Sequence, residues 1–133
     1  MNPIALSFRY FKLVLFISLF FCTGVCYVLL HNVQHQLYLA LPALFFICYI
    51  IFLFFFCAEA WLEDKNLSYK KIFQQKIIRQ ITEIKNVKTY RTRSTIYNKI
   101  VFQNEDFFFI MESAYRTSGK ESIAELLNRV RDN

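Results

Sequence analysis

The residue types that carry chemistry in most enzymes are scarce in the second half of this chain. From residue 60 to residue 133 the sequence contains no histidine and no cysteine, and no glycine-rich loop that could cradle a phosphate. Glu105 and Asp106 are adjacent carboxylates, but they lie in a predicted polar turn, where a solvated role is favoured over acid–base chemistry. A catalytic site needs a nucleophile, a base or a set of metal ligands brought together by the fold. The sequence therefore predicts a protein that is not an enzyme, with no catalytic residue and no cofactor.

Two pairs of side chains in the first half have the spacing of one helix face. His31 and His35 are four residues apart, but two ligands without a third make a weak metal site, so we interpret them as interfacial polar residues. Cys22 and Cys26 also share a face, with no charged or imidazole partner close in sequence, and are interpreted as packing thiols. We predict no metal site.

Positive charge is the most informative feature of the second half. The chain has 16 basic and 10 acidic residues, and most of the basic ones follow residue 60. They either fix the membrane topology and keep the domain soluble, or form a face that binds anionic lipid headgroups or a protein partner. Nucleic acid is not expected, because no stacking motif accompanies the charge. The candidate lipid-binding or partner-binding residues are Lys70, Lys71, Lys76, Arg79, Arg91, Arg93 and Lys99.

Two long uncharged segments must position this basic region. Residues 13–30 and residues 37–58 contain no charge, and each is long enough to cross a hydrocarbon core of about 30 Å as a helix. A six-residue polar connector joins them, so they are predicted to form a transmembrane α-helical hairpin. Thr23 and Gly24 form its only small-residue notch and are predicted to pack closely against the second helix.

The distribution of charge predicts how the hairpin lies in its membrane. Arg9 and Lys12 precede the first span and the connector has no Lys or Arg, so both termini are expected on the cytoplasmic side. The first span is longer than the apolar core of a usual signal peptide and is interpreted as a retained anchor. Trp61 suits the aromatic belt at the inner interface. The expected location is a bacterial inner (plasma) membrane, as a multi-pass protein.

The division of the chain follows from the hairpin. Residues 1–61 are predicted to form the N-terminal arm and the hairpin, and residues 62–133 a small cytoplasmic α+β domain. Residues 62–66 are interpreted as an exit turn from the membrane. The predicted domain is one antiparallel sheet of about five strands, which cover residues 67–73, 76–81, 87–93, 95–102 and 107–112.

A single amphipathic helix is predicted at the end of the chain. Ser118 and Glu121 fit a capping box, and the apolar residues that follow recur at helical spacing. This helix is expected to lie across one open face of the sheet. Its apolar stripe consists of Ile123, Leu126, Leu127 and Val130.

The order of a two-span anchor, an antiparallel sheet and a capped C-terminal helix resembles small bacterial membrane proteins with a pleckstrin-homology-like (PH-like) domain. The residues that carry the resemblance are 67–73, 77–87 with Ile81, Ile84 and Val87 at intervals of three, 100–110 and 123–130, within a region of roughly 62–131. A full domain of that type usually has seven strands. The five placed here therefore imply a partial barrel, or a barrel completed by a neighbouring chain.

Three functions agree with these patterns. The first is a non-catalytic inner-membrane protein whose basic PH-like module binds a protein partner or anionic lipid at the membrane surface. The second is an immunity protein against a pore-forming bacteriocin, in which the aromatic second span would meet the invading helices. The third is a small assembly subunit of a membrane complex, in which residues 48–57 would pack against other helices. A homo-oligomer is compatible with each of them.

Overall fold

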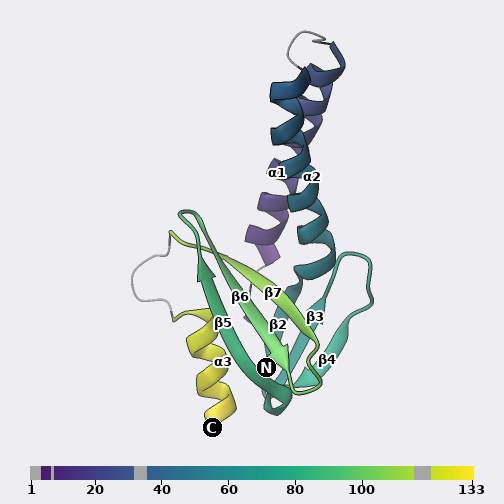
Figure 1. Ribbon diagram of the computed structural model, residues 1–133. Coiled ribbons are helices and arrows are strands. Elements are labelled where there is room, and N and C mark those ends of the chain that lie inside the picture. The colour runs from purple at the N-terminus through teal and green to yellow at the C-terminus, as the bar shows by residue number, and fades with distance from the viewer. Residues whose placement is uncertain (1–3, 7, 32–35, 116–120) are drawn as a thin grey trace.

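The computed structural model describes residues 4–6, 8–31, 36–115 and 121–133 (Figure 1). Two long helices, α1 (Phe8–His31) and α2 (Gln36–Phe56), project as a hairpin from a β domain. Only 6% and 11% of the residues in their most apolar windows are buried, so neither is the core helix of a globular domain. By length and composition both helices can cross a membrane. This confirms the predicted pair of long apolar helices.

An aromatic ring contact joins the two helices. The rings of Phe21 and Phe46 stack with their centroids 6.1 Å apart. A methyl group added at Gly24 would meet no atom within 4 Å, and Thr23 donates a hydrogen bond to the carbonyl of Leu19 in its own helix. The predicted close packing against α2 is therefore wrong for Gly24, and for Thr23 it stays a prediction.

The first sheet has four antiparallel strands in the order β1-β2-β3-β4. They are β1 (Ile4–Ala5), β2 (Glu59–Glu63), β3 (Asn66–Lys70) and β4 (Ile77–Gln80). β1 precedes the hairpin and β2 follows it, yet the two strands pair, with Ile4 opposite Leu62 and Ala5 opposite Trp61. Both ends of the hairpin therefore enter the same sheet.

The second sheet has three antiparallel strands, β5 (Ile84–Arg91), β6 (Thr95–Phe102) and β7 (Phe107–Ser113). A short 3₁₀ helix, η2 (Ile81–Glu83), connects β4 to β5. Residues 103–106 form the turn predicted between β6 and β7, and Glu105 adopts a φ of 67° there. Every second residue of β6 from Ile96 to Phe102 is buried, as a strand with one face on a core requires.

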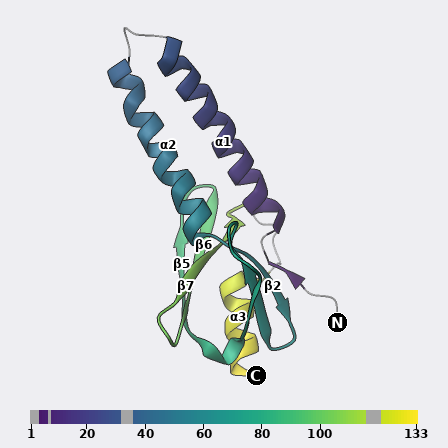
Figure 2. The ribbon, with the colours of Figure 1, turned by 90° about the vertical axis from the view of Figure 1, so that its right-hand side faces the viewer.

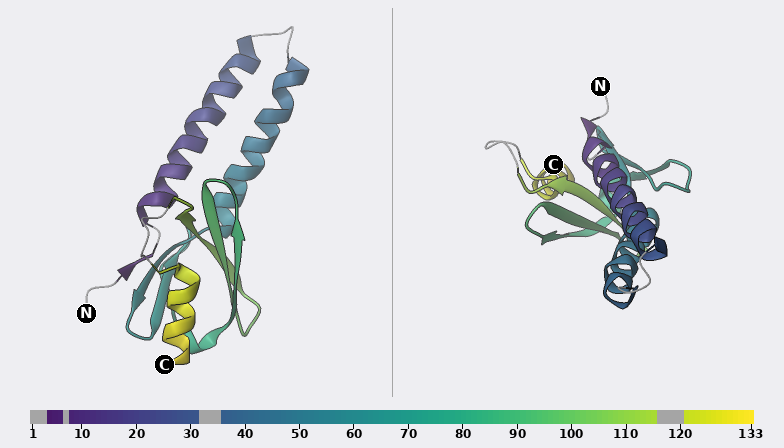
Figure 3. Two further views of the ribbon diagram at one scale, coloured as in Figure 1. Left: turned by 90° about the vertical axis from the view of Figure 1, so that its left-hand side faces the viewer. Right: turned by 90° about the horizontal axis from the view of Figure 1, so that it is seen from above.

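The main hydrophobic core lies between the two sheets and is closed by the helix α3 (Ile123–Asp132). Tyr69 of the first sheet stacks on Phe108 of the second, with ring centroids 4.1 Å apart. Ile123 and Leu127 place the apolar stripe of α3 in this core. Figures 2 and 3 show α3 at the opening between the two sheets.

The N-terminus of α3 differs from the prediction. Ser122 is the N-cap residue, its hydroxyl accepts a hydrogen bond from the Glu125 backbone, and the Glu125 carboxylate accepts one from the Ser122 backbone. The predicted cap, Ser118, lies outside the described residues. Two S-x-x-E motifs follow one another in the sequence, and the second is the one adjoining the apolar stripe.

The predicted single sheet of about five strands is wrong in its organisation, because the strands divide into a four-stranded and a three-stranded sheet. The predicted exit turn at residues 62–66 is also wrong. Leu62 and Glu63 belong to β2, and the chain turns only at residues 64–65, where Asp64 has a φ of 52°. Trp61, expected at the membrane interface, is part of β2 and lies under the ammonium of Lys76.

Candidate functional site

A second hydrophobic cluster joins the base of the hairpin to the β domain. Phe11 of α1, Leu53 of α2 and Met111 of β7 are buried against one another together with Cys57. The Ala58 backbone N–H donates to the carbonyl of Phe109, which fixes the exit of α2 on β7. The hairpin is thus packed onto the domain.

Cys57 belongs to this cluster and not to the outer surface of the hairpin. Its side chain is fully buried. A thiol of this kind is inert at neutral pH. The hypothesis that residues 48–57 pack against helices of another protein therefore cannot use Cys57.

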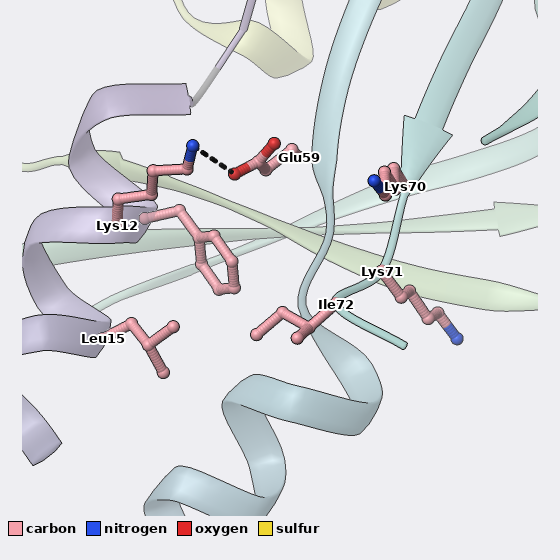
Figure 4. Close-up of a pocket in the computed structure, with 7 residues that line it drawn as sticks. Lys12, Leu15, Glu59, Lys70, Lys71 and Ile72 are labelled. Carbon is pink, nitrogen blue, oxygen red and sulfur yellow. Dashed lines mark ion pairs between the residues drawn. The ribbon is translucent and has the colours of Figure 1, made fainter. Parts of the chain in front are cut away.

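A pocket of about 300 Å³ opens beside this cluster, between α1, the start of β2 and the end of β3 (Figure 4). The Lys12 ammonium lies 3.8 Å from the Glu59 carboxylate, whose side chain is 15% exposed. Lys70 stands opposite Glu59 in the β2–β3 register. The lining residues are Phe11, Lys12, Leu15, Glu59, Lys70, Lys71 and Ile72.

The pocket combines an apolar side with an excess of positive charge. Phe11, Leu15 and Ile72 supply the apolar side, and three lysines outnumber the single carboxylate. Figure 4 shows Lys12 directed toward Glu59 and Lys71 extending away from it. Such an arrangement can hold an anionic group beside a hydrocarbon group. The described residues contain no cluster of three metal-ligating side chains.

Two turns of the domain reach the base of the hairpin from different sides (Figure 1). In the turn between β3 and β4, the ring of Phe73 stacks on Phe54 of α2 at 5.2 Å between centroids. In the turn between β5 and β6, the carbonyl of Ser94 accepts a hydrogen bond from the hydroxyl of Tyr10 in α1. Both turns therefore lie beside the helix ends that adjoin the domain.

Four of the seven candidate basic residues lie in these two turns or at the strand ends that lead into them. Lys70 and Lys71 begin the first turn, and Arg91 and Arg93 lie at the second. All four were selected for their charge, and the fold brings them to the same end of the hairpin.

The other three candidates contact groups of the domain itself. Lys76 lies over the Trp61 ring, and Lys99 lies 4.1 Å from the ring centroid of Phe107. Arg79 forms ion pairs with Asp106 at 2.8 Å and with Glu83 at 3.4 Å. The contact with Asp106 also means that this carboxylate is not simply solvated in its turn. These three residues are not part of the pocket.

Sequence reasoning missed Lys12 and Glu59 as site residues. Lys12 was used only to orient the first span, and Glu59 was not considered as its partner. A lysine at the start of one span and a glutamate at the end of the other are a signal for such a pair, because a hairpin brings those two ends together. Of the histidine pair, His31 contacts Tyr27 of its own helix, and His35 lies outside the described residues.

No protein-family model matches the chain, and no curated protein or solved structure is significantly similar to it. The function must therefore be argued from the geometry above.

Proposed function

We propose that this chain is a non-catalytic integral membrane protein whose basic module binds anionic lipid headgroups at the membrane surface. The observation that carries the proposal is the position of Lys70, Lys71, Arg91 and Arg93 at two turns beside the base of an apolar helical hairpin. Cations at this place meet the headgroups of the leaflet that the hairpin enters.

Helix length supports this placement. The 24 residues of α1 extend about 36 Å and the 21 residues of α2 about 32 Å, against a hydrocarbon core of about 30 Å. The ends of the helices next to the domain then reach the headgroup layer. Each Lys or Arg near an anionic leaflet contributes about 1 kcal/mol of attraction, so four together make a substantial contribution to lipid binding.

The resemblance to PH-like domains is part of the same proposal. Seven strands and one closing C-terminal helix, within a single chain, support it better than the five strands expected from the sequence. The hairpin interrupts this domain between its first and second strands. A location in a bacterial inner membrane with both termini in the cytoplasm remains a prediction from the charge distribution.

The pairing of β1 with β2 supports the interpretation of the first span as a retained anchor. Removal of α1 together with the residues before it would also remove a strand of the first sheet. A cleaved signal sequence has no such role in the mature fold.

Native mass spectrometry of the full-length protein in mild detergent tests the proposal. Phosphatidylglycerol, phosphatidylserine and phosphatidylcholine with the same acyl chains are titrated separately. We expect both anionic lipids to be retained at concentrations at least about tenfold lower than the neutral one, since several charge contacts act together. Equal retention of all three lipids would show the proposal to be wrong.

A charge-removal variant and a matched control show which residues produce the preference for anionic lipid. Glutamine at positions 70, 71, 91 and 93 is expected to abolish most of the preference for anionic lipid. Glutamine at Lys65, Lys85, Arg129 and Arg131 removes the same charge from the β2–β3 turn, the start of β5 and α3, outside the two basic turns. This control variant is expected to preserve the preference. Equal losses in the two variants would mean that net charge alone attracts the lipid.

A further inference from the structure

A second pocket, of about 350 Å³, lies between the hairpin and the turn that connects β5 to β6. Seven of its ten lining residues carry a hydroxyl group and none carries a charge. Its remaining wall consists of Leu13, Val14 and Ile17, which belong to the apolar span of α1. A group of hydroxyls beside an apolar span is unusual, because each polar group there needs a hydrogen-bond partner.

Ser18 is one of these polar residues within the span of α1. The residue is 6% exposed and lines the pocket, but its hydroxyl makes no hydrogen bond with another described residue. Thr23 in the same helix, by contrast, donates to the Leu19 carbonyl at 2.8 Å. The hydroxyl is therefore available to a group that enters the pocket.

The other hydroxyls leave both donors and acceptors available. Tyr49 and Tyr97 share one hydrogen bond of 2.8 Å, which uses one of their two hydroxyl hydrogens. The Tyr10 hydroxyl lies 2.9 Å from the Ser94 carbonyl and 2.7 Å from the Thr95 hydroxyl, which leaves the Ser94 hydroxyl outside this network. A ligand group that both donates and accepts fits this lining, and an ammonium or carboxylate would find no opposite charge in it.

The surroundings of the pocket indicate what else the ligand carries. Arg91 and Arg93 flank the pocket residue Thr92 in the chain, and both are exposed. Guanidinium groups suit a phosphate, and the apolar wall of α1 suits an acyl chain. The pocket and its neighbours thus supply hydroxyls for a polar headgroup, guanidinium groups for a phosphate and an apolar wall for an acyl chain.

We propose that this pocket binds the polyol headgroup of an anionic phospholipid of the glycerol type, with Ser18 as a direct hydrogen-bonding partner. The inference builds on the proposed function but goes beyond it, because charge attraction alone does not distinguish between anionic headgroups. A soluble polyol phosphate shares this chemistry. The lipid is favoured as the source because residues of the span form one wall.

The test compares two lipids of equal charge. Full-length protein in mild detergent is titrated with phosphatidylglycerol and with phosphatidylserine of identical acyl chains, and the bound lipid is quantified by native mass spectrometry. We expect phosphatidylglycerol to be retained at about fivefold lower concentration, the factor that one or two additional hydrogen bonds supply. Equal retention of the two, both above phosphatidylcholine, would overturn this inference and leave the proposed function intact.

Two variants and one competitor make the test specific. Ser18→Ala is expected to bring the two anionic lipids to equal retention without loss of folding, because it removes an unpaired hydroxyl from a helix. Thr23→Val removes a hydroxyl of the same helix outside the pocket and is expected to keep the preference. A preference that survives Ser18→Ala would overturn the inference. So would displacement of the lipid by its deacylated headgroup, glycerophosphoglycerol, at equal concentration, since the ligand would then be a soluble one.

Discussion

The hydroxyl oxygens of Tyr49 and Tyr97 lie 2.8 Å apart, and this hydrogen bond ties α2 to β6 where the hairpin meets the second sheet. Replacing either tyrosine by phenylalanine leaves the other hydroxyl half-buried and without this partner. We expect each single change to lower the free energy of unfolding by about 1 to 2 kcal/mol. The decrease in the free energy of unfolding should be smaller for the double variant than the sum of the two single decreases. Thermal unfolding in detergent, followed by the fluorescence of the sole tryptophan, Trp61, measures it. Additive effects would mean that the two hydroxyls do not interact.

The burial of Tyr97 predicts a response to alkaline pH. Burial raises the pKa of Tyr97 above its ordinary value of 10.0. A raised pKa in the folded state favours the neutral hydroxyl, so its contribution to stability is fully present below pH 10 and is lost as the pH rises beyond it. We expect the unfolding temperature of the wild type to fall between pH 9 and pH 11 by more than that of Tyr97→Phe. Tyr115→Phe, at an exposed tyrosine, should respond as the wild type does.

Arg79 is predicted to stabilise the fold and to leave lipid binding unchanged. Its guanidinium joins β4 to the turn between β6 and β7 through Asp106, and its side chain is 23% exposed. Arg79→Gln should lower the free energy of unfolding by about 1 kcal/mol. Native mass spectrometry should find the same lipid preference as in the wild type. A change in lipid preference with unchanged stability would reverse this assignment.

Cys57 is predicted to be unreactive in the folded protein. Its side chain is fully buried, so reagents have no access to the thiol. Iodoacetamide should leave Cys57 unmodified in detergent and alkylate it after denaturation, as peptide mass spectrometry can show. Rapid alkylation of the native protein would contradict the packing of Cys57 against Phe11 and Leu53.

Ser122 is predicted to be the residue that caps α3. Ser122→Ala should lower the free energy of unfolding by about 1 kcal/mol, because it removes the acceptor for the Glu125 backbone N–H. Ser118→Ala is the matched comparison, since the first S-x-x-E motif places the cap there. The unfolding temperatures of the two variants decide between the motifs, and a larger loss at Ser118 would favour the first.

Local patterns were sufficient for the hairpin and for the strands β6 and β7. Charge-free segments longer than a bilayer core have few alternatives, and the turn at residues 103–106 separates two strand-forming runs. β1 was missed because two residues show no periodicity. β2 was missed because Ala60, Trp61 and Leu62 directly follow an apolar span and resemble its end.

The candidate site was only partly predictable for a different reason. Positive charge near a span is visible in the sequence, and it identified Lys70 and Lys71. The division into two sheets and the contact of Lys12 with Glu59 depend on residues far apart in the chain, which no local pattern reports. Arg79 carries the same charge as Arg91. Only its ion pairs with Glu83 and Asp106 show that it stabilises the fold.

The pairing of β1 with β2 across the hairpin has a consequence for biosynthesis. β1 leaves the ribosome first, but about 55 residues must follow before its partner β2 is complete. At roughly 5 to 20 residues per second this delay is on the order of several seconds, during which both spans emerge. The first sheet can then close only if the insertion machinery has returned the chain to the side on which it began. Completion of the sheet thus depends on correct insertion of the hairpin, and a chain with one span misplaced leaves β2 with an unpaired edge, which quality-control proteases can recognise.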